Sequence, residues 1–205
     1  MKAFIYVGGS ILPENVTEHP KGDDLRIAAD SGYKNAELLG ERVDIFVGDF
    51  DSFDGELPES VEVIRLKPEK DLTDTQAAVE IAIDRGANEL VIVGGLDGRL
   101  DHTMSNLGIL VDARLRGFRA VILDGRNRVR FIKNESELVP RSGYTYLSLL
   151  AHGAVAKGVE AEGVKYPLRN AKLKPNLQYA VSNEINGNCA LVSVRKGELF
   201  VIESR

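Results

Sequence analysis

The sequence predicts an α/β fold in which a mostly parallel, Rossmann-like sheet flanked by helices is followed by a smaller antiparallel β-sandwich domain. Over the first 125 residues, short apolar segments rich in β-branched residues alternate with segments of helical periodicity, as in parallel sheets covered by helices. After Gly125 the helical periodicity largely disappears, and apolar segments are separated by Gly, Asn and Pro, as in antiparallel β domains. We therefore expect two domains, residues 1–125 and 126–205.

In the first domain the strands are expected at residues 3–8, 26–30, 44–50, 61–67, 89–95 and 119–124. Helices are expected at residues 33–39, 74–85 and 102–116. In the second of these, Ala78, Ile81 and Ala82 share one face, and Gly86 is a stop signal. In the second domain the strands are expected at residues 144–150, 179–182, 190–195 and 199–202, whereas the charged segment 126–142 is ambiguous.

The composition excludes several classes of protein. With 43% hydrophobic and 28% charged residues, and no apolar run near the roughly 18 residues of a membrane span, no membrane partner is expected. The net charge of -5 argues against nucleic-acid binding, which needs a basic face. The first nine residues carry one basic residue and too short an apolar run for a signal peptide. Because Cys189 is the only cysteine, no internal disulfide forms, and we expect a cytoplasmic protein.

Acidic side chains follow several predicted strands, at the sheet edge where open α/β folds bind ligands. Asp49 and Asp51 form an Asp-x-Asp pair at a strand end, so both carboxylates point to the same side. Asp30, Asp71 and Asp74 reach the same edge if their strands are neighbours. Since clustered carboxylates repel one another unless a hard cation neutralises them, the pattern predicts a Mg²⁺ site.

Helix capping is the alternative interpretation of these acids. A single Asp after a strand is often a cap or turn residue, and Thr73 with Gln76 fits a capping box before the second helix. One cap does not need two acids, so Asp49 and Asp51 together favour a metal site over a cap.

A glycine-rich run follows the fifth predicted strand and precedes a helix: Gly94-Gly95-Leu96-Asp97-Gly98-Arg99-Leu100-Asp101-His102. Glycine lets backbone N–H groups approach phosphate, and Arg99 can add charged hydrogen bonds, so the run is a candidate ATP loop. A tight turn would use the same glycines, and the run matches neither the Walker A motif nor the Rossmann fingerprint. His102 either contacts the nucleotide or satisfies the start of the helix.

The order of four motifs resembles the thiamine pyrophosphokinase family: Ala29-Asp30-Ser31-Gly32, Val47-Gly48-Asp49-Phe50-Asp51-Ser52, Lys70-Asp71-Leu72-Thr73-Asp74, and the run at residues 94–102. The resemblance covers nearly the whole chain, and its second and fourth motifs are specific. It implies that an α/β domain binds ATP and Mg²⁺ and that a β-sandwich domain binds thiamine. It also implies a homodimer with the active site at the subunit interface.

The resemblance assigns roles to individual residues. The metal and phosphate acids are Asp30, Asp49, Asp51 and Asp71, with Asp74 close by; the nucleotide-loop residues are Gly94, Gly95, Arg99, Asp101 and His102; and the thiamine-binding residues are Ser182 and Asn183. Some family members stack a tryptophan on thiamine, whereas this chain has no Trp. Phe200 stands at the equivalent position and either offers an aromatic face to the cationic ring or is an ordinary inward-facing strand residue.

The expected reaction is attack by the hydroxyl of thiamine on the β-phosphorus of ATP, giving thiamine diphosphate and AMP. Arg99 and Mg²⁺ stabilise the developing charge, and Asp71 or Asp74 acts as the base or as a metal ligand, a choice that the sequence leaves open. Two alternatives also stay open. One is pyrophosphate transfer to a hydroxymethyl pterin, and the other is a non-catalytic sensor of a nucleotide or thiamine diphosphate.

Overall fold

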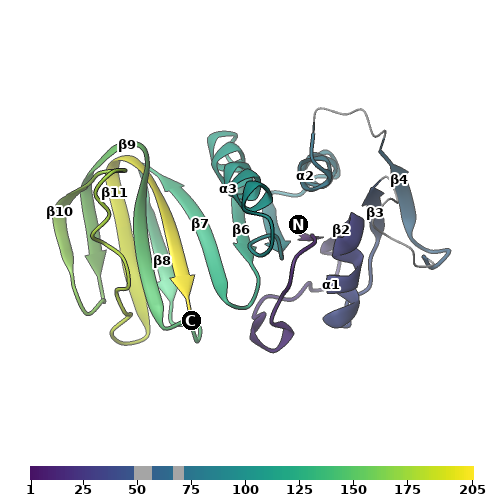
Figure 1. Ribbon diagram of the computed structural model, residues 1–205, viewed down its shortest axis with the longest axis horizontal. Helices are drawn as coiled ribbons and strands as arrows, with labels where there is room; N and C mark the ends of the chain where they lie inside the picture. Colours follow the sequence, from purple (N-terminus) through teal and green to yellow (C-terminus); the bar gives the residue numbers. More distant parts are fainter. Residues whose placement is uncertain (49–56, 67–71) are drawn as a thin grey trace. The chain divides into compact units, whose positions relative to one another are not determined.

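The computed structural model describes residues 1–48, 57–66 and 72–205, and it divides into two compact units, Met1–Gly125 and Arg126–Arg205 (Figure 1). No helix among these described residues is long and apolar enough to cross a membrane.

The first unit contains a parallel sheet. Its strands are β1 (Lys2–Tyr6), β2 (Leu25–Ala29), β3 (Ile45–Gly48), β4 (Glu62–Arg65), β5 (Glu89–Val93) and β6 (Arg119–Leu123). They lie in the order β6-β5-β1-β2-β3-β4, and each neighbouring pair is parallel. Successive strands first add on one side of β1 and then, from β5, on the other. The strand order therefore reverses between β1 and β5, the point at which such sheets open a ligand crevice.

Among the described residues, three α-helices and two short 3₁₀ helices connect these strands. They are α1 (Tyr33–Leu38), α2 (Asp74–Asp84), α3 (Leu100–Leu115), η1 (Pro13–Asn15) and η2 (Asp30–Gly32). In Figure 1, α1 lies on one side of the sheet and α2 and α3 lie on the other. Because both faces are covered, strands such as β5, with sequence ELVIV, are apolar almost throughout instead of alternating. The predicted strands and helices of this unit are confirmed, with small shifts at their ends.

Local chemistry sets the starts of two helices. The capping box before α2 is confirmed, because the Thr73 backbone N–H donates to Gln76 Oε1 (3.0 Å) and the Gln76 N–H donates to Thr73 Oγ1 (3.2 Å). At the start of α1, a Cβ atom on Gly32 would lie 2.1 Å from the carbonyl oxygen of Tyr6. Only glycine therefore lets this helix begin directly against β1.

The second unit is antiparallel. Its strands are β7 (Asn127–Lys133), β8 (Ser136–Pro140), β9 (Tyr146–Glu162), β10 (Leu168–Leu173) and β11 (Cys189–Ser204). The long strands β9 and β11 pair from Leu191↔Glu162 to Ser204↔Tyr146, while β8 pairs with the first part of β11 and β7 with its last part. One hydrophobic cluster, which includes the fully buried Val159 and Leu199, draws on both parts of these strands.

The structure corrects several expectations in this unit. The two strands expected at 190–195 and 199–202 are one strand, because Gly197 (φ 123°) accommodates a register shift without ending it. The strand expected at 144–150 is the beginning of β9, and the ambiguous segment 126–142 contains β7 and β8. The strand expected at 179–182 is wrong, since Ser182 has φ 57°, and this stretch is joined to β9 by hydrogen bonds such as Leu149 N–H to the Ala180 carbonyl.

Candidate functional site

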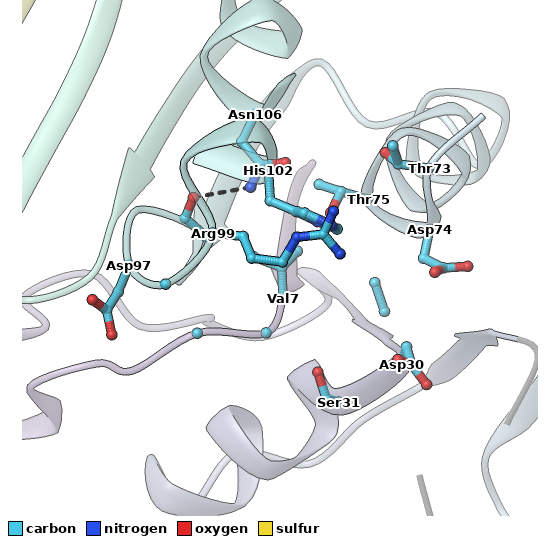
Figure 2. Close-up of a pocket in the computed structure, with 15 residues that line it drawn as sticks. Val7, Asp30, Ser31, Thr73, Asp74, Thr75, Asp97, Arg99, His102 and Asn106 are labelled. Atoms are coloured by element: carbon cyan, nitrogen blue, oxygen red, sulfur yellow. Dashed lines mark hydrogen bonds between the residues drawn. The ribbon is translucent and has the colours of Figure 1, made fainter. Parts of the chain in front are cut away.

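A cavity of about 370 Å³ lies at the carboxyl edge of the parallel sheet, where the strand order reverses (Figure 2). It is lined by residues that follow β1, β2 and β5 and by residues at the starts of α2 and α3. Five predicted site residues line it together: Asp30, Asp74, Gly95, Arg99 and His102. Asp49, Asp51 and Asp71 lie outside the described residues, and within the described ranges no three His, Cys, Asp or Glu side chains form a metal-binding group.

Asp30 is held in an uncommon conformation at the end of β2. It has φ 49°, and among the described residues its buried Oδ1 atom has no hydrogen-bond partner. The end of β3 approaches closely, because a Cβ atom on Gly48 would lie 3.4 Å from Asp30 Cα. A buried carboxylate oxygen without a partner is costly, whereas the same oxygen is the ligand type that Mg²⁺ prefers. This oxygen therefore fits a cation site.

Arg99 and Asp101 form a two-point ion pair at the start of α3. Arg99 Nη2 lies 2.5 Å from Asp101 Oδ2, and Nε lies 3.1 Å from Oδ1, which also accepts from the His102 backbone N–H at 2.9 Å. The pKa of Asp101 is lowered, chiefly by the hydrogen bond from Arg99. In Figure 2, Arg99 and His102 project from α3 toward Thr75 and Asp74 on α2. The helix start uses the backbone of His102, so its ring remains available to the cavity.

The glycines after β5 form a tight turn against the end of β1. Gly94 and Gly95 have φ values of 100° and 76°. A Cβ atom on Gly94 would lie 2.6 Å from the carbonyl oxygen of Val7, and one on Gly95 would lie 2.5 Å from Asn106 Nδ2. The turn explains why glycine stands at both positions, and nucleotide contact by these residues stays a prediction.

Two buried asparagines at this edge of the sheet were not predicted. Asn35 on α1 and Asn106 on α3 are 5% and 6% exposed. Asn35 Nδ2 donates to the carbonyl oxygens of Val7 (2.7 Å) and Gly9 (2.9 Å), and Asn106 Nδ2 donates to that of Gly95 (2.9 Å). Asn106 lies three residues before Ile109, on the apolar face of its helix. A polar residue on that face was the available signal.

In the second unit, Asn183 helps to line a cavity of about 110 Å³. The side chain of Asn183 makes two hydrogen bonds to the backbone of Tyr166: Oδ1 accepts from the Tyr166 N–H (3.0 Å), and Nδ2 donates to the Tyr166 carbonyl (2.8 Å). The backbone N–H of the adjacent Ser182 donates to Ser148 Oγ (3.0 Å). Aromatic and aliphatic side chains, including Tyr166 and Tyr179, provide the other walls.

Phe200 lies elsewhere on the second unit. Its ring packs edge-to-face against Phe131 (5.0 Å between centroids) and His152 (5.4 Å). Its neighbours Leu199 and Val201 are fully buried in the core cluster, so alternation along β11 puts Phe200 on the opposite face. Phe200 therefore lies outside that core cluster, and its contact with thiamine stays a prediction.

Comparisons with known proteins give consistent matches along the chain. Residues 17–122 match the family model for the thiamin pyrophosphokinase catalytic domain, and residues 133–199 match that for the thiamin pyrophosphokinase vitamin B1 binding domain. Thiamine pyrophosphokinase of Bacillus subtilis is 26% identical over 163 residues, covering 77% of this chain and 76% of the relative. Thiamin pyrophosphokinase 1 of Caenorhabditis elegans is 28% identical over 169 residues, covering 78% and 69%.

Solved structures agree with these matches. The crystal structure of thiamin pyrophosphokinase from Geobacillus thermodenitrificans superposes with a TM-score of 0.84 at 26% identity, covering 100% of this chain and 98% of the other. The Bacillus subtilis enzyme superposes with a TM-score of 0.87 at 22% identity, covering 100% and 99%. The mixed α/β fold with a C-terminal antiparallel domain is thus confirmed.

Proposed function

The chain belongs to the thiamin pyrophosphokinase family, and on this basis we propose which of its residues carry out the reaction. It is an ATP-dependent diphosphotransferase that transfers a pyrophosphoryl group from ATP to the hydroxyl of thiamine, giving thiamine diphosphate and AMP. The two family models, matched in order along the chain, carry this conclusion. The hydroxymethyl pterin and sensor alternatives gain no support from the comparisons.

We propose that the phosphates of ATP bind in the 370 Å³ cavity beside Arg99. Three features support this: the cavity lies at the reversal of strand order, a glycine turn forms part of its wall, and a guanidinium enters it from the start of α3. Gly94 and Gly95 shape the turn, Asp101 orients Arg99, and His102 faces the nucleotide. Arg99 stabilises the charge that develops on the transferred group.

Asp30, Asp49, Asp51 and Asp71 are the proposed Mg²⁺ ligands. The unpartnered, buried Oδ1 of Asp30 supports this set, because such an oxygen has no other compensating contact among the described residues. A bound Mg²⁺ would neutralise phosphate oxygens and make the β-phosphorus more electrophilic.

The remaining catalytic assignment concerns the proton of the thiamine hydroxyl. Asp74 is in the first turn of α2 and lines the cavity, and Asp71 precedes it along the chain. We propose that one of these two carboxylates accepts the proton as the hydroxyl oxygen attacks in line with the leaving AMP oxygen.

We further propose that Ser182, Asn183 and Phe200 contribute to thiamine binding. The apolar cavity beside Asn183 and the half-buried aromatic ring of Phe200 suit an aromatic, cationic ligand. The enzyme is also proposed to act in the cytoplasm as a homodimer with its active site at the subunit interface. These last two proposals rest on the family resemblance and, for the compartment, on the single cysteine.

An assay that quantifies every product directly tests the proposed pyrophosphoryl transfer. Purified protein is incubated with ATP, Mg²⁺ and thiamine, and AMP, ADP and thiamine diphosphate are quantified by mass detection. Equal amounts of AMP and thiamine diphosphate are expected. Formation of ADP would contradict pyrophosphoryl transfer, and a product with a hydroxymethyl pterin but none with thiamine would favour the other acceptor. Absence of any thiamine-dependent product would contradict the assignment as an enzyme.

A further inference from the structure

A continuous set of hydrogen bonds connects α1 to α3 across the reversal of strand order. Asn35 on α1 donates to the carbonyls of Val7 and Gly9, the residues that follow β1. The carbonyl of the intervening Gly8 accepts from the Gly95 backbone N–H at 2.9 Å. The Gly95 carbonyl then accepts from Asn106 on α3. We call this set the loop bridge.

We propose that Asn35 and Asn106 are positioning residues for ATP, which act together through the loop bridge to fix the backbone of the phosphate-binding edge. Neither side chain is a catalytic residue in this proposal. The inference rests on the proposed function, because it assumes that ATP occupies the cavity lined by Gly8, Gly9, Gly95 and Arg99.

The loop bridge turns backbone carbonyl groups away from the position proposed for the phosphates. Peptide carbonyl oxygens carry partial negative charge, so a carbonyl turned toward the cavity would repel a triphosphate. The two asparagine side chains engage the carbonyls of Val7, Gly9 and Gly95 at 2.7 to 2.9 Å. These oxygens are thereby held toward buried donors on the helices, and the loop peptides cannot rotate without losing them.

The two asparagine side chains also restrict the glycine turn sterically. A Cβ atom on Gly94 would lie 3.1 Å from Asn35 Nδ2, and one on Gly95 would lie 2.5 Å from Asn106 Nδ2. Each carboxamide thus packs directly on a glycine of the turn that carries Arg99. The glycines let the turn form, and the asparagines select one position for it. A loop that is already in place loses less entropy when ATP binds.

The loop bridge also joins the two helices that follow the proposed ligands. Asn35 lies on the helix that follows Asp30, and Asn106 lies one turn or more beyond Arg99 and His102 on α3. The loop bridge therefore connects the segment carrying the proposed metal ligand to the segment carrying the proposed phosphate ligand. A shift of about 1 Å between such groups is enough to lower a rate by about 100-fold.

The test compares Asn35→Ala, Asn106→Ala and the double variant in the full-length protein. Each single variant is expected to raise the KM for ATP and the Kd for ATP, measured by calorimetry without thiamine, by about tenfold, with the KM for thiamine changed less than about twofold. Because the two residues act through one set of bonds, the double variant should be weakened by much less than the product of the single effects.

Two control variants separate positioning from stability. Leu110→Ala removes buried apolar contacts from α3, and Asn134→Ala removes a side chain whose Oδ1 accepts from the Gly197 N–H at 2.8 Å in the second unit. Both should lower the melting temperature and leave the KM for ATP unchanged.

Three results would overturn the inference: a lower melting temperature with unchanged ATP affinity, an equal rise in both KM values, or fully multiplicative single effects. Failure of the proposed function is a different result, because wild-type protein would then form no thiamine diphosphate. Calorimetry with ATP would still report on the loop bridge in that case.

Discussion

Asp101 holds the guanidinium of Arg99 at two points, with Nη2–Oδ2 and Nε–Oδ1 distances of 2.5 and 3.1 Å, at the start of α3. Both side chains are mostly exposed, so the pair adds little to stability. Its consequence is orientation, because a fixed planar fork suits two oxygens of a phosphate.

Replacing Arg99 by lysine tests this orientation. Lysine keeps the charge but cannot form the fork, so kcat/KM for ATP is expected to fall by about 10- to 100-fold. Steady-state kinetics at saturating thiamine measures the change. Arg116→Lys is the matched control, since Arg116 forms a similar two-point pair with Glu80 at the other end of the same helix. Equal losses in both variants would exclude a special role for Arg99.

Asp30→Asn should separate metal binding from folding. Asparagine tolerates the positive φ of this position and removes the charge of a carboxylate whose buried Oδ1 has no partner among the described residues, so stability without Mg²⁺ should stay equal or rise by up to about 1 kcal/mol. The Mg²⁺ concentration for half-maximal activity should increase at least about tenfold. Thermal melts with and without Mg²⁺ and ATP provide both readouts. A wild-type response to Mg²⁺ would remove Asp30 from the ligand set.

Asp49→Asn is expected to lower kcat by at least about 100-fold while the chain stays folded, because a metal ligand that stabilises the transition state is lost. Product formation and circular dichroism together measure this. The exposed Asp23 offers a matched Asp→Asn control in a turn that does not line the cavity. Wild-type turnover in the Asp49 variant would exclude this residue from the site.

Phe200→Leu is expected to raise the KM for thiamine by about fivefold and leave the KM for ATP unchanged, because it removes an aromatic face from a cationic substrate. Phe118→Leu in the first unit is the control, and its ring contacts Arg116. If thiamine kinetics are identical in the two variants, Phe200 serves only to pack against Phe131 and His152.

The hydrogen bonds of Glu198 predict that the free energy of unfolding depends on pH. A hydrogen bond from His152 (3.0 Å), the larger effect, and one from Lys133 (3.0 Å) hold the pKa of Glu198 below its ordinary value. Its contribution is therefore fully present above the ordinary glutamate pKa of about 4.3 and is lost as pH falls through the lower folded-state value. Urea unfolding of Glu198→Gln should show a smaller loss of free energy between pH 5 and 3, on the order of 1 kcal/mol less than wild type. Glu162→Gln should behave as wild type does.

Much of the first unit was predictable because its signals are local. The apolar run of β5 directly predicts a strand, and the capping box at Thr73 directly predicts the start of a helix. Once the strands are known, the acids that follow them are placed at the ends of those strands. The sequence also pointed correctly to one sheet edge for Asp30, Asp74 and Arg99. The proposed roles of these residues, and of Asp49, Asp51 and Asp71, stay predictions.

Other features depend on contacts between distant residues. Asn35 looks like an ordinary helix residue until the carbonyls that it binds are known, and Asn106 differs only in being a polar residue on an apolar helix face. Gly197 looks like a strand break, although cross-strand pairing carries β11 past it. Tyr179 to Ser182 have an apolar, strand-like composition, but the left-handed backbone of Ser182 prevents a regular ladder.

The pairing of β9 with β11 also bears on how the chain is made. Tyr146 lies opposite Ser204, and β11 separates β9 from both β7 and β8. During synthesis, β7, β8 and β9 therefore emerge from the ribosome before the strand that joins them exists. The β unit can acquire its native sheet only after residue 204 has left the exit tunnel, which makes its folding a late and largely all-or-none event.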